Sequence, residues 1–292
     1  MLPFDHKSSF AELFGFTNPE LSSEEKGAVA NAKEIIYTAF RKIVEQEIPK
    51  EQAAISVDEE YGDKIIKDAV NQKYNVFLAT EKDRQKEFDF EYEDDFAKHL
   101  EKYKSGLVKV LIRYNPNDDP LSKMRQQQKL AILSNYCHEK SYKFFLGILV
   151  SPTSSQANET GGDNSFYDNH VRPNLTVNAI EELQSAGVEP DIWGIEGMES
   201  EDSYKIVSLQ ARKEGRDDVG IIILGRSGNA DKVEKFIRPG SKIKGIIGFA
   251  TGRTVFWEPL TAYKNGKIDQ AKVIELISNN FLNLYRIFTN KV

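Results

Sequence analysis

The sequence predicts an α/β fold, and within that class a (β/α)8 TIM barrel whose single domain spans residues 1–292. Short apolar runs alternate with longer segments of helical periodicity, and eight such runs occur along the chain. Most runs are nearly continuous in Val, Ile, Leu or Phe, which is typical of parallel strands buried on both faces. An open doubly wound sheet is the alternative, but no GxGxxG motif follows the first run.

The apolar runs and the helical patterns alternate in a regular order. The predicted strands span residues 1–4, 53–57, 75–79, 107–112, 143–150, 190–195, 219–224 and 244–250. The predicted helices span residues 24–46, 62–72, 94–104, 121–139, 176–186, 201–214, 230–237 and 268–288. Apolar residues recur on one stripe of the first helix at Ile36, Phe40 and Ile43, and on one stripe of the last at Ile274 and Ile277. Glycine follows several helices, as in SAGVEPDIW and KSGLVKV, where a helix must stop before the next strand.

Residues 151–174 form a long polar segment after the fifth predicted strand. In a barrel, the end of that strand lies at the carboxyl-terminal mouth, where active sites are found. We expect a loop here, which is either a lid over the site or an insertion without function.

Composition excludes several classes of partner and site. The net charge of -6 gives no reason to expect nucleic acid or an anionic membrane as a partner. The single cysteine, Cys137, rules out an intrachain disulfide and is compatible with a reducing compartment. The first residues, MLPFDHKSS, have no apolar signal-peptide core, and no stretch approaches a membrane span. We therefore expect a soluble cytoplasmic protein.

Two glycine–arginine pairs follow the last two predicted strands, in LGRSGN and ATGRT. TIM barrels often bind phosphate in these loops through backbone N–H groups and a helix N-terminus, and arginine adds bidentate contacts. The alternative is that the glycines serve turns and the arginines are solvated. The candidate phosphate ligands, which include an arginine at the end of the fourth strand, are Gly225, Arg226, Ser227, Gly252, Arg253 and Arg113.

Lys109 lies in the apolar middle of the fourth predicted strand, between Val108 and Val110. Inside a barrel its ammonium needs a carboxylate partner, and Asp58 or Glu196 could serve. The lysine is therefore either half of a structural ion pair or a functional amine, whose nucleophilicity rises when burial lowers its pKa.

Other kinds of chemistry have little support in the sequence. The four histidines are scattered and form no HxH or HExxH motif, so we expect no metal and no cofactor. There is no GxSxG motif, and Cys137 falls near the end of a predicted helix.

Six segments, in chain order, resemble one family: LPFDHK, DEEYG, VKVLIRYNP, FFLGILV, AGVEPDIWGIEGME and GFATGRTVFW. They are similar to the tagatose-1,6-bisphosphate aldolase-like class I aldolases. The nearest branch is the aldolase-like domain of inositol-catabolism proteins, which is fused in some of them to 5-dehydro-2-deoxygluconokinase. The resemblance runs the length of the chain, and it implies a (β/α)8 barrel and metal-independent cleavage of a phosphorylated ketose through a lysine imine.

The resemblance also assigns roles to individual residues. Asp5 matches the strand-1 aspartate, Asp58 the strand-2 acidic motif and Lys109 the strand-4 lysine. Gly252 and Arg253 match the phosphate-binding pair of strand 8.

Two positions depart from the family pattern. The imine-forming lysine stands two residues before the strand-6 glutamate, and here Gly194 precedes Glu196. A strand-5 glutamate that transfers protons is replaced by Gly147. Without the amine, no Schiff base can form. Without the carboxylate, the rate of proton transfer falls by a factor of about 10² to 10⁴. Two glycines are also expected to widen the barrel mouth.

Several functional hypotheses follow from this mixed pattern. The first, implied by the resemblance, is that the chain is an aldolase-like enzyme of carbohydrate or inositol catabolism that acts on a ketose bisphosphate or a 2-deoxy-5-keto-gluconate 6-phosphate type of sugar. In that case Lys109 or Lys7 forms the imine, while Asp5, Asp58 and Glu196 orient it or move protons. Alternatively it runs a different reaction, binds a sugar phosphate without turnover, or is a partner of a sugar kinase. Because aldolase barrels commonly associate, a homo-oligomer is expected.

Overall fold

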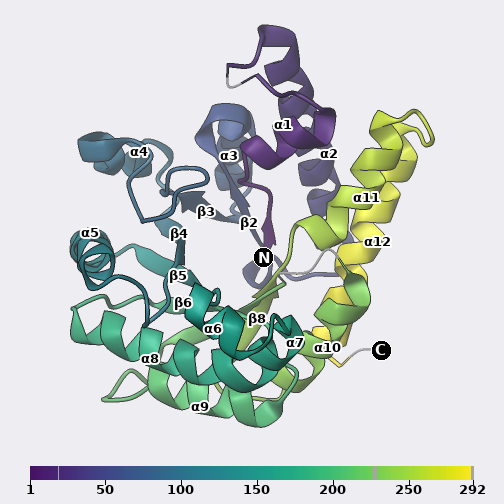
Figure 1. Cartoon of the computed structure of the whole chain (residues 1–292). Helices are drawn as coiled ribbons and strands as arrows, with labels where there is room; N and C mark the ends of the chain where they lie inside the picture. Colours follow the sequence, from purple (N-terminus) through teal and green to yellow (C-terminus); the bar gives the residue numbers. More distant parts are fainter. Residues whose placement is uncertain (19, 226–228, 291–292) are drawn as a thin grey trace.

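The computed structural model describes residues 1–18, 20–225 and 229–290, and its centre is one parallel sheet in which the strands follow in chain order from β1 to β8. The strands are β1 (Leu2–Pro3), β2 (Ala54–Val57), β3 (Asn75–Ala79), β4 (Leu107–Arg113), β5 (Lys143–Leu149), β6 (Ile192–Glu196), β7 (Gly220–Leu224) and β8 (Ile246–Ala250). The amino group of Met1 donates to the Phe249 carbonyl at 2.7 Å, and the Thr251 N–H donates to the Met1 carbonyl at 3.3 Å, so β8 lies beside β1. The predicted (β/α)8 barrel and its eight strand positions are confirmed (Figure 1).

Helices surround the strands, as Figure 1 shows. Those that the sequence predicts are α2 (Ser23–Gln46), α3 (Glu59–Asn71), α4 (Phe96–Tyr103), α5 (Pro120–Glu139), α8 (Arg172–Ser185), α9 (Glu201–Ala211), α10 (Ala230–Gly240) and α12 (Gln270–Phe288). Outside residues 151–174, the described residues form two further helices that the sequence did not predict, α1 (Ser8–Phe14) and α11 (Arg253–Lys264). Short 3-10 turns lie at Lys50–Gln52 and Glu93–Asp95.

The expectation of a loop over residues 151–174 is wrong, because most of this segment is helical. It contains α6 (Ser154–Glu159), α7 (Asn164–Phe166) and a π-helical turn at Tyr167–Val171 that leads into α8. Thr153 caps α6, and the Tyr167 hydroxyl donates to the Val150 carbonyl at 3.0 Å. Polar side chains here serve caps and internal hydrogen bonds, which the polar composition alone did not reveal.

The two glycines that interrupt the family pattern are adjacent in the barrel wall, since Gly147 and Gly194 are register partners of β5 and β6. A Cβ atom on Gly194 would lie 2.5 Å from Cζ of Phe145 and 3.0 Å from Cα of Gly147. A Cβ atom on Gly147 would lie 2.7 Å from Cδ1 of Leu111. The glycines therefore do not widen the barrel mouth, because neighbouring apolar side chains fill the space that they leave.

A fully buried ion pair joins α2 to the amino-terminal strands. Lys33 is 0% exposed, and its ammonium donates to the carbonyls of Phe4 at 2.9 Å and His6 at 3.0 Å and to the Asp58 carboxylate. Asp58 also caps α3 by accepting the Tyr61 N–H at 2.9 Å. Burial lowers the pKa of Lys33 and raises that of Asp58, and the mutual attraction opposes both shifts. This pair fixes the strand ends from which the polar mouth of the barrel is built.

We expect Gly194→Ala to destabilise the protein by about 1–3 kcal/mol, because the added methyl meets Phe145 and backbone. Gly27→Ala is the matched control, since a Cβ atom there has open space on the exposed side of α2 and should stabilise by about 0.5–1 kcal/mol. Denaturant unfolding measures both. An unchanged midpoint for Gly194→Ala would show that the barrel interior has room for a side chain.

Lys33→Met should cost about 3–5 kcal/mol, because it leaves Asp58 buried without its cation. The double variant Lys33→Met/Asp58→Asn should recover part of that loss, because asparagine keeps the cap on α3 and carries no charge. Equal destabilisation of the single and double variants in denaturant unfolding would contradict this account.

Candidate active site at the barrel mouth

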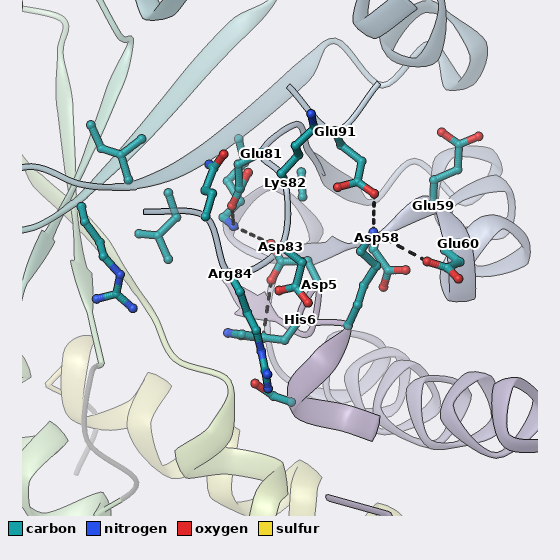
Figure 2. Close-up of a pocket in the computed structure, with 18 of the residues that line it drawn as sticks. Asp5, His6, Asp58, Glu59, Glu60, Glu81, Lys82, Asp83, Arg84 and Glu91 are labelled. Atoms are coloured by element: carbon teal, nitrogen blue, oxygen red, sulfur yellow. Dashed lines mark hydrogen bonds and ion pairs between the residues drawn. The ribbon is translucent and has the colours of Figure 1, made fainter. Parts of the chain in front are cut away.

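A cavity of about 360 Å³ opens at the carboxyl-terminal ends of β1 to β4 (Figure 2). Its lining is rich in charged side chains of both signs, which include Asp5, His6, Lys7, Asp58, Glu60, Glu81, Arg84, Glu91, Lys109, Arg113 and Arg253. The cavity lies at the carboxyl-terminal strand ends of the barrel, where the sequence predicts the site. Neither Gly147 nor Gly194 lines it.

A buried lysine that lines the cavity is held between two carboxylates. Nζ of Lys109 lies 2.5 Å from Oδ2 of Asp5 and 2.6 Å from Oε1 of Glu81, and the lysine is 5% exposed. Ser56 donates to the same Asp5 oxygen at 3.0 Å. The expectation that Asp58 or Glu196 neutralises Lys109 is wrong, since Asp5 and Glu81 do so. We call these three side chains the Asp5–Lys109–Glu81 cluster.

The cluster holds its lysine as an ammonium. Burial on its own lowers the pKa of Lys109, but the two adjacent carboxylates outweigh burial and raise this pKa above its ordinary value. Burial raises the pKa of Asp5, but Lys109 reverses that shift and holds the pKa well below its usual range. Burial raises the pKa of Glu81, so Glu81 is the carboxylate of the pair that accepts a proton more readily.

His6 stands beside the cluster with a neutral ring. Its Nδ1 lies 3.7 Å from Oδ1 of Asp5 and has no hydrogen-bond partner among the described residues. Burial lowers the pKa of His6, and the attraction of Asp5 opposes the shift. Figure 2 shows Asp5, His6 and Glu81 grouped together, with the Glu59 carboxylate turned away from them.

Two arginines that lack side-chain partners in the described part of the chain face the same cavity. Arg113 ends β4 and Arg253 begins α11, and both are exposed. Neither guanidinium forms a hydrogen bond or an ion pair with another residue in the described part of the chain. Gly252, at the N-cap position of α11, has no side chain that could cap the helix, and a Cβ atom there would lie 2.2 Å from the Pro3 carbonyl oxygen. Gly252 is therefore required for the close approach of β1 to the start of α11.

The other predicted phosphate loop is only partly described. Gly225 follows β7, and a Cβ atom there would lie 2.7 Å from Oγ1 of Thr251. Arg226 and Ser227 lie outside the described residues.

Glu196 has a different environment from the cluster. It accepts the Val150 N–H at 2.7 Å and lies 3.7 Å from Nη1 of Arg172, and it does not line the cavity. Asp58 does line the cavity, but its two oxygens are used by Lys33 and by the cap of α3.

Two other lysines near the mouth are poor candidates for an imine. Burial on its own lowers the pKa of Lys7, but a hydrogen bond to Glu91 and the nearby Glu60 raise it. Lys33 has a lowered pKa, but it is fully buried and does not line the cavity.

Sequence reasoning missed Glu81 and Lys33. Glu81 could have been predicted, because strand alternation places Phe77, Ala79 and Glu81 on one face of β3 and its extension. Lys33 gave no signal, since a lysine within an amphipathic helix is normally solvated.

Among the residues that the structure describes, no group of three His, Cys, Asp or Glu side chains is placed to hold a metal ion. Within the same residues, no helix combines the length and the apolar character needed to cross a membrane.

Solved structures with a similar fold include sugar-phosphate aldolases. Fructose-bisphosphate aldolase from Plasmodium falciparum aligns with a TM-score of 0.65 at 13% identity, over 98% of this chain and 89% of that chain. A Corynebacterium glutamicum protein aligns with a TM-score of 0.60 at 12% identity, over 100% and 85% of the two chains. Fructose-bisphosphate aldolase from Slackia heliotrinireducens aligns with a TM-score of 0.54 at 11% identity, over 95% and 84%. At these identities the likeness establishes the fold, an aldolase-like TIM barrel.

No curated protein matches the sequence. A family model described as "Uncharacterized protein conserved in bacteria (DUF2090)" matches residues 1–292, and the chain therefore belongs to this family.

Proposed function

We propose that the protein binds a phosphorylated sugar in the mouth of its aldolase-like barrel. One observation carries the proposal: Arg113 and Arg253, which have no side-chain partner among the described residues, face the same cavity as the Asp5–Lys109–Glu81 cluster. Arginine binds phosphate through bidentate hydrogen bonds, and the uncapped α11 N-terminus beside Arg253 adds N–H donors. The cluster offers an ammonium to the oxygen of a carbonyl or hydroxyl group.

The class of sugar comes from the resemblance and the structural neighbours. The family-like segments imply a ketose bisphosphate or a 2-deoxy-5-keto-gluconate 6-phosphate type of ligand in carbohydrate or inositol catabolism. Two of the similar structures are fructose-bisphosphate aldolases, which supports a phosphorylated ketose. A single domain, a homo-oligomer and a cytoplasmic location stay predictions.

We further propose that Lys109 acts as a fixed positive charge and forms no imine. An imine requires a neutral amine, and Lys109 is an ammonium between two carboxylates. Asp5 holds this ammonium, Asp58 supports the wall of the cavity, and Glu196 positions Arg172 and the end of β5. A binder without turnover is the second candidate, because apolar side chains occupy the space where the family has its imine lysine.

Arg253→Ala should weaken binding of sugar phosphates by about tenfold to a hundredfold, the value of one charge-assisted contact. Thermal shift and calorimetry with dihydroxyacetone phosphate, fructose 6-phosphate and fructose 1,6-bisphosphate measure it, and a ligand at 100 times its Kd should stabilise the unmodified protein by about 2.7 kcal/mol. Arg238→Ala, an exposed arginine of α10 outside the cavity, is the control. Binding of none of these sugars, or equal binding of dihydroxyacetone and its phosphate, would contradict the proposed function.

Borohydride reduction in the presence of dihydroxyacetone phosphate should give no covalent lysine adduct. The measurement is intact mass followed by peptide mapping, at a ligand concentration shown by calorimetry to saturate the site. An adduct at Lys109 or Lys7 would instead establish a relocated aldolase nucleophile.

A further inference from the structure

The mouth contains more acid–base machinery than phosphate binding needs. Glu81 and Asp5 flank Lys109, His6 adds a ring whose buried Nδ1 has no hydrogen-bond partner among the described residues, and all four side chains line one cavity. Glu81 is the member that neither the family resemblance nor any sequence motif assigns.

The geometry separates the four groups into different chemical tasks. Asp5 accepts hydrogen bonds from Lys109 and Ser56 on its Oδ2, and its side chain is only 6% exposed, so it is less accessible to a ligand than Glu81. Glu81 shares Oε1 with Lys109, and its Oε2 lies 3.2 Å from the Thr80 N–H, longer than the short contact to the lysine. The Glu81 side chain is 13% exposed and the Lys109 side chain 7%, so both reach a largely desolvated part of the cavity.

A carboxylate that can accept a proton, an ammonium and a neutral imidazole suit one type of reaction. Removing a proton from a carbon next to a carbonyl requires a base at the carbon and positive charge or a hydrogen-bond donor at the oxygen. Triosephosphate isomerase combines a glutamate base with a neutral histidine for this step. Here Glu81 corresponds to the base, and Lys109 and His6 to the groups at the oxygen.

We propose that the Asp5–Lys109–Glu81 cluster, with His6, catalyses imine-independent and metal-independent proton transfer between adjacent carbons of a bound phosphorylated ketose. This inference rests on the proposed function, because the ligand must first bind with its carbonyl at Lys109. Asp5 positions Lys109, and Glu81 and His6 touch the reacting atoms.

The step balances without any co-reactant. Glu81 takes the proton from the α carbon, the C–H electron pair forms the C=C bond of an enediolate, and the carbonyl π pair moves onto the oxygen beside Lys109. His6 moves a proton between the two enediol oxygens, and protonated Glu81 returns its proton to either carbon. If Glu81 exchanges its proton with solvent and then returns a proton to the original carbon, that carbon acquires a solvent hydrogen. If the proton goes to the neighbouring carbon, ketose and aldose interconvert, and in neither case does net oxidation occur.

The test is solvent deuterium exchange into dihydroxyacetone phosphate and fructose 6-phosphate, followed by proton NMR and mass spectrometry in deuterium oxide. We expect enzyme-dependent deuterium uptake at the carbon next to the carbonyl, without a borohydride-trapped adduct. Glu81→Gln keeps an oxygen for Lys109 and should lower the exchange rate by at least about a hundredfold, with Kd changed by less than about threefold.

Glu182→Gln is the matched control, since Glu182 is a partly buried glutamate 3.0 Å from a lysine, Lys123, outside the cavity, and it should retain full exchange. Should Glu81→Gln fold poorly by circular dichroism, Glu81→Asp provides the second variant. It keeps the charge but withdraws the carboxylate by one carbon, and exchange should fall by at least about tenfold.

The outcomes separate the inference from the proposed function. Sugar phosphate binding without exchange in the unmodified protein would overturn the inference and leave the proposed function in place. Exchange accompanied by a trapped lysine adduct, or unchanged exchange in folded Glu81→Gln, would also overturn it. If no sugar phosphate binds, the proposed function fails and the inference fails with it.

Discussion

The mouth of this barrel depends on the need to pair buried ammonium groups. Lys33 reaches from α2 and Lys109 from β4, and both are almost completely enclosed. Their partners, Asp5, Asp58 and Glu81, come from the ends of β1, β2 and β3. Because an uncompensated buried charge costs several kcal/mol, these contacts hold the first four strand ends in one arrangement. The polar cavity is formed by the same side chains that satisfy this constraint.

The same pairing determines which chemistry is available. A lysine between two carboxylates is charged, rigid and a poor nucleophile, but it is a preorganised positive charge for an oxygen that becomes negative. The barrel interior is consistent with that role, because Phe145 and Leu224 occupy the space beside Gly194 where the resembling family carries its amine. Apolar side chains therefore fill the space of the absent lysine, and a lysine could not be introduced at this position without moving them.

The sequence predicted the fold well, because continuous apolar runs and 3.6-residue periodicity depend on local composition. It predicted the cavity from the topology of a barrel, but not the pairing inside it. Strand alternation places Glu81 on the inner face, yet only the three-dimensional arrangement selects it over Asp58 as partner of Lys109. The burial of Lys33 could not be predicted from the sequence, because it depends on a carboxylate from another element. Residues 151–174 were misjudged because polar caps such as Thr153 resemble loop composition.

The distribution of charge at the barrel mouth also favours one orientation of a bound sugar phosphate. The Asp5–Lys109–Glu81 cluster has two carboxylates for one ammonium, so a phosphate placed there would be repelled. Arg113 and Arg253 carry positive charge that no described residue neutralises, so a phosphate is stabilised there instead. A sugar phosphate that follows this field directs its phosphate to the arginines and its uncharged carbonyl to Lys109. The proposed site therefore selects ligands whose phosphate and carbonyl lie at different positions of one small molecule, and it disfavours anions that carry charge at the reacting carbon.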